Sequence, residues 1–242
     1  MRTVTVASVK PTHAWPRPFW LGVAVVMASL CWLAVAIPLK AQAGVPAPLE
    51  IPLAQTAPKL DGSCNTEEYA GAVRQNFIDR NGFQGFVVLE HDSSNLYVCL
   101  FGAPGSNPDR YASVYLDTDN GREKLAESDD DALNITIVSQ TLSSGVGDGT
   151  GSYTPTVISG WNAKALFSPA GGGESAEWSI PVGLVSQECG ANFGISVFHH
   201  QVVEKPDNFG WPTPSIPNSP ESCQEAKLAV LVCGADLSIT KS

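Results

Sequence analysis

Short runs of alternating apolar and polar residues make up most of the chain between Lys59 and Gly234. In one of them Leu133, Ile135 and Ile137 alternate with polar residues, as expected for a strand with one buried and one solvated face. Sustained helical periodicity is absent from this part of the sequence. The alternation predicts strands at residues 86–89, 96–101, 112–116, 133–138, 153–158, 176–180, 193–198 and 228–232.

The connections between these runs are rich in Gly, Pro, Asn, Asp and Ser, which favour turns. Many short strands joined by such turns are typical of an antiparallel sandwich or barrel. Only residues 66–72 and 181–186 predict a helical turn, and the prolines of residues 44–58 predict an extended linker or an edge strand. Residues 59–233 are long enough for one two-layer core. We therefore predict a single all-β domain, an antiparallel β-sandwich.

Residues 1–43 have the pattern of a secretory signal peptide. They contain basic residues and no acidic residue, an apolar run at 19–39, and the small residues of Ala41-Gln-Ala43, which suit a cleavage site. The apolar run approaches the length that spans a bilayer, so an uncleaved N-terminal anchor is the alternative. Both interpretations predict export, to the medium or to the cell surface.

The charge of the chain bears on its partners. The formal net charge is −10 at pH 7, and it becomes more negative if the leader is removed, because residues 1–43 contain basic but no acidic residues. An acidic domain repels phosphate groups, which argues against nucleic acid and anionic lipid as partners. No apolar stretch after the leader is long enough to cross a membrane, so we expect no membrane insertion after cleavage.

Five of the six cysteines follow the leader. Spaced cysteines in an exported protein usually form disulfides, and the chain has no C-x-x-C pair that would indicate a zinc ribbon or a thioredoxin-like site. An odd number leaves at least one thiol. We expect Cys64 to join Cys233 and Cys189 to join Cys223, with Cys99 as a buried thiol in a strand, although spacing alone does not decide the connectivity.

Five phrases follow one another along the chain: Leu60–Tyr69, Asn95–Leu100, Ser113–Asn120, Glu177–Val182 and Phe193–His200. In this order they resemble the DOMON-like fold and, within it, carbohydrate-binding module family nine. The resemblance implies a jelly-roll-type β-sandwich that binds carbohydrate, and it extends over Lys59–Cys233. One departure is Cys64-Asn65, where the family often has Leu-Asp.

A group of acidic and amide residues is a candidate calcium site. Asp117, Asp119 and Asn120 end one predicted strand, and Asp129 and Asp130 follow in an acidic run. Ca²⁺ takes six to eight oxygen ligands in flexible geometry, which suits loops of this kind. Structural calcium is common in the family that the chain resembles. Two alternatives are a solvated turn with a capping aspartate and a set of acceptors for sugar hydroxyls.

Two tryptophans in loop-like stretches are candidate sugar platforms. Aromatic rings bury the flat C–H faces of sugars, while neighbouring polar groups bond to the hydroxyls. Trp161 is followed by Asn162, and Trp211 comes shortly after Asp207 and Asn208. We expect exposed indoles at both positions, with loop anchors packed on the sandwich as the alternative.

Other aromatic and histidine residues predict structural roles. Trp178 alternates with apolar positions and is expected in the core. Haem-binding members exist among DOMON domains, but both methionines lie in the leader, so a Met/His haem pair is excluded for the mature chain. His199 and His200 are neighbours on a predicted strand and should face opposite ways, which disfavours a shared metal. Together with His91 they are expected to bond to loops.

No catalytic motif is present: the chain lacks H-E-x-x-H and G-x-S-x-G. Glu174 and Glu177 could imitate a glycosidase pair, but they stand three residues apart beside a glycine run rather than across a cleft. We therefore expect no enzymatic activity.

The C-terminal residues 234–242 resemble the opening strand of the bacterial surface repeat called domain of unknown function eleven. They could begin an immunoglobulin-like stalk or form an ordinary polar tail. The combined expectation is an exported, non-catalytic module that binds carbohydrate. The alternative functions are a structural or adhesive cell-surface module without a small ligand and, less in keeping with the residues, a haem-binding electron-transfer domain.

Overall fold

The computed structural model describes residues 47–79, 82–167, 172–186, 188, 190–201, 207–213 and 218–229, with the backbone alone at 201, 207 and 208. The described residues form strands joined by turns and two short 3-10 helices. The strands are β1 (Leu49–Ile51), β2 (Val73–Ile78), β3 (Gln84–His91), β4 (Asn95–Gly102), β5 (Tyr111–Asp117), β6 (Asp130–Thr136), β7 (Leu142–Gly147), β8 (Tyr153–Pro155), β9 (Asn162–Leu166), β10 (Glu174–Pro181), β11 (Phe193–Gln201), β12 (Asp207–Trp211) and β13 (Gln224–Leu228), and the helices are η2 (Val182–Leu184) and η3 (Pro220–Ser222).

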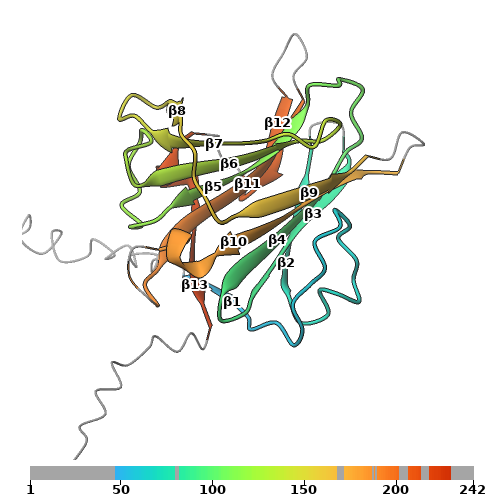
Figure 1. The fold of residues 1–242 in the computed structure, drawn as a ribbon, viewed down its shortest axis with the longest axis horizontal. Helices are drawn as coiled ribbons and strands as arrows, with labels where there is room; N and C mark the ends of the chain where they lie inside the picture. The colour runs from blue at the N-terminus through green and yellow to red at the C-terminus, as the bar shows by residue number, and fades with distance from the viewer. Residues whose placement is uncertain are drawn as a thin grey trace, which may run out of the picture. The chain divides into compact units, whose positions relative to one another are not determined.

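The strands form two sheets that lie as two layers (Figure 1). The five-stranded sheet has the order β2-β3-β4-β10-β9, and all its pairs are antiparallel. The eight-stranded sheet has the order β1-β13-β11-β5-β6-β7-β8, with β12 also paired to β11. Its β1–β13 pair is parallel and the others are antiparallel. The predicted fold class, an antiparallel β-sandwich, is therefore confirmed.

Apolar alternation places the core between the two sheets. On β10, Ala176, Trp178 and Ile180 are almost completely buried in one cluster with Leu133 and Ile135 of β6. Side chains at every second position of a strand share a face, so these residues turn inward together. The prediction that Trp178 belongs to the core is confirmed by its exposed fraction of 0%.

Several strands lie outside the predicted set. The edge strand β2 has three consecutive polar residues, β9 has mainly alanine as its apolar residue, and β7 contains two glycines, so none of them shows large apolar residues at alternating positions. β12 is the fourth strand that the pattern did not predict. The proline-rich segment at 44–58, expected as linker or edge strand, contributes β1, which pairs with β13. The strand predicted at 228–232 overlaps β13 only at Leu228, and residues 230–232 lie outside the described residues.

A disulfide corrects the expected cysteine pairing. Cys64 is bonded to Cys99, with 5.5 Å between the Cα atoms, and Cys223 is a buried free thiol next to Ser196. Cys99 belongs to β4 and points to the outer face of the five-stranded sheet, which the turn after residue 60 covers. Pairing depends on which segment covers that face, and residue spacing carries no such information. Cys189 and Cys233 lie outside the described residues.

The predicted leader and the C-terminal tail at 234–242 also lie outside the described residues. Among the described residues, no helix is long and apolar enough to cross a membrane.

Candidate functional site

One groove on the described surface contains a predicted ligand-binding tryptophan. It has a volume of about 510 Å³ and lies between β7 and the loop that leads into β9. Its walls combine apolar side chains with serine and threonine hydroxyls. The lining residues are Leu142, Ser143, Ser144 and Pro155–Trp161.

The indole of Trp161 has a defined orientation in this groove. Its Nε1 donates to the carbonyl of Ile158 at 2.9 Å, and the half-buried ring packs against the main core. The loop itself is tied to β7, because Ser144 Oγ accepts from the Ile158 N–H at 3.0 Å and donates to the Thr156 carbonyl at 2.6 Å. Val157, at the top of the loop, is 94% exposed. The ring is thus held at the surface beside hydroxyl groups.

The other predicted ligand-binding residues lie elsewhere or are only partly described. Asn162 is exposed next to Trp161, and its Oδ1 accepts from the Ala163 N–H at 2.9 Å. Trp211 ends β12 in the eight-stranded sheet, and it does not line the groove of Trp161. Asp207 and Asn208 begin β12, and their side chains lie outside the described part of the structure.

The expected exposure of Trp211 is wrong, because the residue is 6% exposed and belongs to the main core. The loop-like sequence around it forms a strand that pairs with β11, where Trp211 stands opposite Val197. Strand pairing turns the ring toward the apolar interior, and the ring has little surface left for a ligand. Of the two tryptophans, only Trp161 is available as a platform.

The predicted calcium ligands meet where β5 ends and β6 begins. Carboxylate oxygens of Asp117, Asp119 and Glu123 lie within 4.8 Å of one another. The loop curls back because Asn120 and Arg122 adopt left-handed conformations, with φ of 59° and 58°. The Asp117 carboxylate then accepts from the Gly121 N–H at 3.0 Å and the Arg122 N–H at 3.1 Å.

Asp129 and Asp130, where β6 begins, lie next to this group but outside the set within 4.8 Å. Asp130 stands opposite Asp117 in the strand register, is completely buried, and accepts from the Glu127 N–H at 2.6 Å. Burial raises the pKa of Asp117 to about 6 and that of Asp130 to about 7, and neighbouring carboxylates add to both shifts. Burial and Asp119 also raise the pKa of Asp129. The site therefore brings together carboxylates, and each of them makes ionisation of its neighbours less favourable.

The chemistry of these donors fits a hard cation. Asn120 Oδ1, Glu123 Oε2, Asp129 Oδ2 and Asp130 Oδ1 are buried atoms that accept no hydrogen bond from the described residues. Buried acceptors normally have a partner, and Ca²⁺ binds carboxylate and amide oxygens. The sequence interpretation did not include Glu123, although an acidic residue two positions after the Gly121 turn is a signal that could have indicated it.

The histidines lie in three different environments. Both ring nitrogens of His91 contact backbone carbonyls, at 2.9 Å to Asp92 and 2.7 Å to Ala229. His199 turns inward, with Nε2 3.3 Å from Glu174 Oε2, whereas His200 turns outward and stacks on Tyr111 at 4.4 Å between ring centroids. The expectation that His199 and His200 face opposite ways is confirmed.

Glu174 and Glu177 also face opposite sides of their sheet. Glu174 contacts Arg110 inside the sandwich, while Glu177 accepts from the Tyr69 hydroxyl on the outer side. Residues an odd number of positions apart on a strand always diverge in this way. The two carboxylates therefore do not flank a common cleft.

Comparison with known proteins shows a likeness of fold. No protein-family model matches the sequence, and no curated protein matches it. Among solved structures, a carbohydrate binding module family 9 protein from Caldicellulosiruptor kristjanssonii in complex with cellotriose is 16% identical, with a TM-score of 0.52 over 74% of this chain and 93% of that one. The structure of such a module from the same organism in complex with glucose gives 16% identity and a TM-score of 0.51, over 74% and 95% of the two chains. The chain thus shares its β-sandwich fold with family 9 carbohydrate binding modules.

Proposed function

We propose that this domain binds carbohydrate without catalysis, and that the groove beside Trp161 is the binding site. The observation that carries the proposal is the orientation of the indole, which a hydrogen bond to Ile158 holds against the core while the groove stays open. A preordered ring loses little conformational freedom on binding, so more of the contact energy appears as affinity.

The composition of the groove supports a sugar rather than a purely apolar ligand. A sugar ring has flat C–H faces, which stack on an aromatic ring, and an edge of hydroxyls, which bond to polar groups. Here Trp161 supplies the ring, and Ser143, Thr156 and Ser159 line the same groove. A volume of about 510 Å³ lies in the range of small-ligand sites. The likeness of fold to modules solved with cellotriose and glucose points in the same direction.

The proposal includes export and a structural cation. The signal-peptide pattern of residues 1–43 supports secretion or surface display. We place Ca²⁺ at the acidic loop, where Asp117, Asp119, Glu123 and Asp130 would hold it together with Asn120 or Asp129. Its charge would neutralise this loop, so its role there is to hold β5 and β6 together rather than to take part in a reaction.

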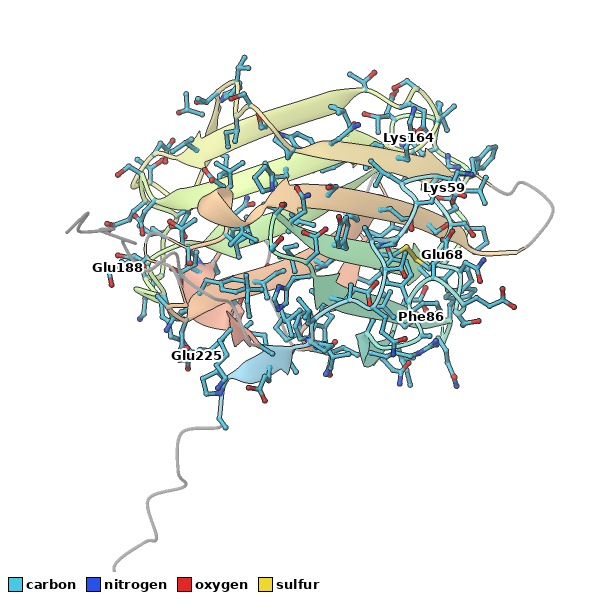
Figure 2. The ribbon with its side chains drawn as sticks, turned by 60° about the horizontal axis from the view of Figure 1, so that its bottom comes forward. Lys59, Glu68, Phe86, Lys164, Glu188 and Glu225 are labelled. Carbon is cyan, nitrogen blue, oxygen red and sulfur yellow. A yellow bond between two sulfur atoms is a disulfide. The ribbon has the colours of Figure 1, made fainter. Side chains whose placement is uncertain are left out.

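Calorimetric titration of the purified chain with glucose and cello-oligosaccharides, preceded by a glycan array, tests the binding site. Trp161→Ala should weaken binding by about tenfold or more, because the indole on which the sugar stacks is replaced by a methyl group, and Trp161→Phe should retain part of the affinity. Phe86→Ala is the matched control, since this half-buried ring, labelled in Figure 2, lies on the outer face of the five-stranded sheet and does not line the groove.

Two outcomes would contradict the proposal in different ways. Unchanged affinity in Trp161→Ala would place the sugar elsewhere on the domain. Absence of binding to every glycan on the array would reject carbohydrate recognition and favour the adhesive or structural surface module.

A further inference from the structure

A second group of carboxylates lies on the outer face of the five-stranded sheet, on a different sheet from the acidic loop of Asp117. Oxygens of Asp61, Glu68 and Glu177 lie within 4.8 Å of one another. The segment that carries Asp61 and Glu68 is held to β4 by the Cys64–Cys99 disulfide; Figure 2 labels Glu68 and draws the disulfide as a yellow bond. The group is therefore at a fixed place on the sheet.

Glu177 is the buried centre of this group. It is 0% exposed, and its Oε2 accepts from the N–H groups of Asp61 at 2.9 Å and Gly62 at 2.6 Å. Its Oε1 accepts from the Tyr69 hydroxyl at 3.0 Å. A carboxylate oxygen has two lone pairs, so Oε1 keeps one acceptor position after this bond. The Glu177 carboxylate can therefore hold the segment and also bind a cation.

Two buried carboxylate oxygens in this part of the structure have no hydrogen-bond donor among the described residues. Glu68 Oε2 and Glu90 Oε1 accept no hydrogen bond from any described residue, and the Glu90 side chain is 1% exposed. Both residues line one pocket of about 420 Å³. Buried carboxylates of this kind require a partner.

The charged side chains described around this pocket do not supply that partner. Lys59 Nζ lies 3.4 Å from Asp61 Oδ2, but these side chains are 77% and 37% exposed, and an exposed pair of this kind contributes little. Lys59 is the basic residue among those that line the pocket, against the acidic Glu67, Glu68 and Glu90. The excess negative charge favours a cationic ligand.

We propose that Asp61, Glu68 and Glu177 bind a divalent cation of the Ca²⁺ type beside Tyr69, with Glu90 as a buried carboxylate that the ion neutralises. The donors are all oxygens, which suits a hard cation and not zinc or copper. The ion and the Cys64–Cys99 disulfide would together hold residues 61–71 against the sheet. This site is separate from the loop site, and one can exist without the other.

Titration of Ca²⁺ into the EDTA-treated full chain, followed by calorimetry and by Tb³⁺ luminescence excited through tyrosine, tests the site. The wild type should bind one ion at each site. Asp130→Asn, which removes a carboxylate of the loop site, should leave the site beside Tyr69 intact. Adding Glu68→Gln to that variant should abolish the remaining binding, and Glu90→Gln should weaken it by about tenfold.

Glu67→Gln is the matched control, because Glu67 lines the same pocket but is exposed and stands outside the three-carboxylate group. In the Asp130→Asn background it should leave the affinity within about twofold. Glu68 is only half-buried, so Gln at this position should keep the fold, and thermal melting in EDTA checks this.

The inference is overturned if Asp130→Asn binds no ion, or if Glu68→Gln in that background binds Ca²⁺ as tightly as Asp130→Asn alone. If Asp130→Asn binds no ion and the wild type binds a single ion, that ion occupies the loop site of Asp117, and the site beside Tyr69 does not exist. A loss of sugar binding would bear on the Trp161 groove and not on this site.

Discussion

Arg110 and Glu174 form an ion pair inside the sandwich, where each side chain is 1% exposed. Arg110 Nε donates to Glu174 Oε1 at 2.8 Å and to Oε2 at 2.6 Å, and His199 stands next to the same carboxylate. Burial acts to raise the pKa of Glu174, but the bonds from His199, Arg110 and the Gly105 N–H outweigh it and the pKa is lowered. The stability that this carboxylate contributes is therefore present at neutral pH and is lost as the pH falls through its lowered pKa.

Replacing Arg110 with Met should destabilise the domain by about 3–5 kcal/mol, because it leaves the Glu174 carboxylate buried without a counter-charge. The double variant Arg110→Met with Glu174→Met should lose less than the single one, since no unpaired charge remains. Urea unfolding monitored by tryptophan fluorescence measures both.

Lys227→Met provides the comparison for this prediction. Lys227 pairs with Glu50 at 3.3 Å on the surface, and these side chains are 42% and 63% exposed, so the loss should stay below about 1 kcal/mol. Equal losses of unfolding free energy for Arg110→Met and Lys227→Met would contradict the prediction that breaking a buried ion pair costs more than breaking an exposed one.

At the scale of elements, the acidic residues that the sequence grouped together lie close to one another at the β5–β6 connection. The sequence indicated Asp117, Asp119 and the following acidic run as one candidate group, because oxygen ligands clustered on loops suit Ca²⁺. The antiparallel pairing of β5 with β6 brings Asp130 opposite Asp117. The left-handed turn at Asn120 and Arg122 then determines which further side chain, Glu123, points back toward them.

The affinity of this loop for Ca²⁺ should fall as the pH falls from about 7 toward 5, since Asp130 and Asp117, with pKa values of about 7 and about 6, must lose their protons to bind. Each carboxylate that titrates should cost about tenfold per pH unit below its pKa. Without the ion the sign is reversed: raised carboxyl pKa values make the folded state less stable as the pH rises from about 4 to about 7.

Calorimetry across this pH range and thermal melting with and without Ca²⁺ measure the two effects. Asp148→Asn serves as the control, because Asp148 is an exposed aspartate in another turn. An affinity that does not change between pH 7 and pH 5 would contradict the assignment of Asp130 and Asp117 as ligands.

At the scale of the whole molecule, cohesion comes from apolar side chains between the two sheets. Trp178 is the largest completely buried side chain, and it lies in one cluster with residues from both sheets. Core side chains of this size leave a cavity when they are truncated, because the surrounding sheets relax only in part. The sandwich should therefore be most sensitive to substitution on the inward positions of β10.

Trp178→Ala should destabilise the domain by about 3–5 kcal/mol, from lost burial and the cavity that remains. Trp161→Ala should cost less than half as much, because this ring is only half-buried at the edge of the core. Chemical denaturation of the two variants compares their free energies of unfolding directly. A larger loss for Trp161→Ala would contradict the prediction that Trp178 contributes more to stability than Trp161.

Prediction from the sequence was strongest for the strands that are rich in apolar residues. β3, β4, β5, β6, β10 and β11 were all predicted. Apolar positions alternate in β6, whereas β3 and β4 have nearly continuous apolar runs and are buried on both faces. The edge strands β2 and β9 were not predicted, since an edge strand needs few apolar residues and takes its structure from the neighbour with which it pairs. The prediction of an exposed Trp211 was wrong for the same reason, because pairing with β11, and not the local sequence, turns its ring inward.

The sequence alone determined the fold class, the inward position of Trp178 and the opposite orientations of His199 and His200, because each of these follows from the two-residue period of a strand. Only the tertiary structure decided the Cys64–Cys99 bond, the availability of Trp161 but not Trp211, and the grouping of Asp61, Glu68 and Glu177. These features depend on which segments cover each face of a sheet. Such contacts join residues far apart in the chain, and no local pattern of hydrophobic and polar positions encodes them.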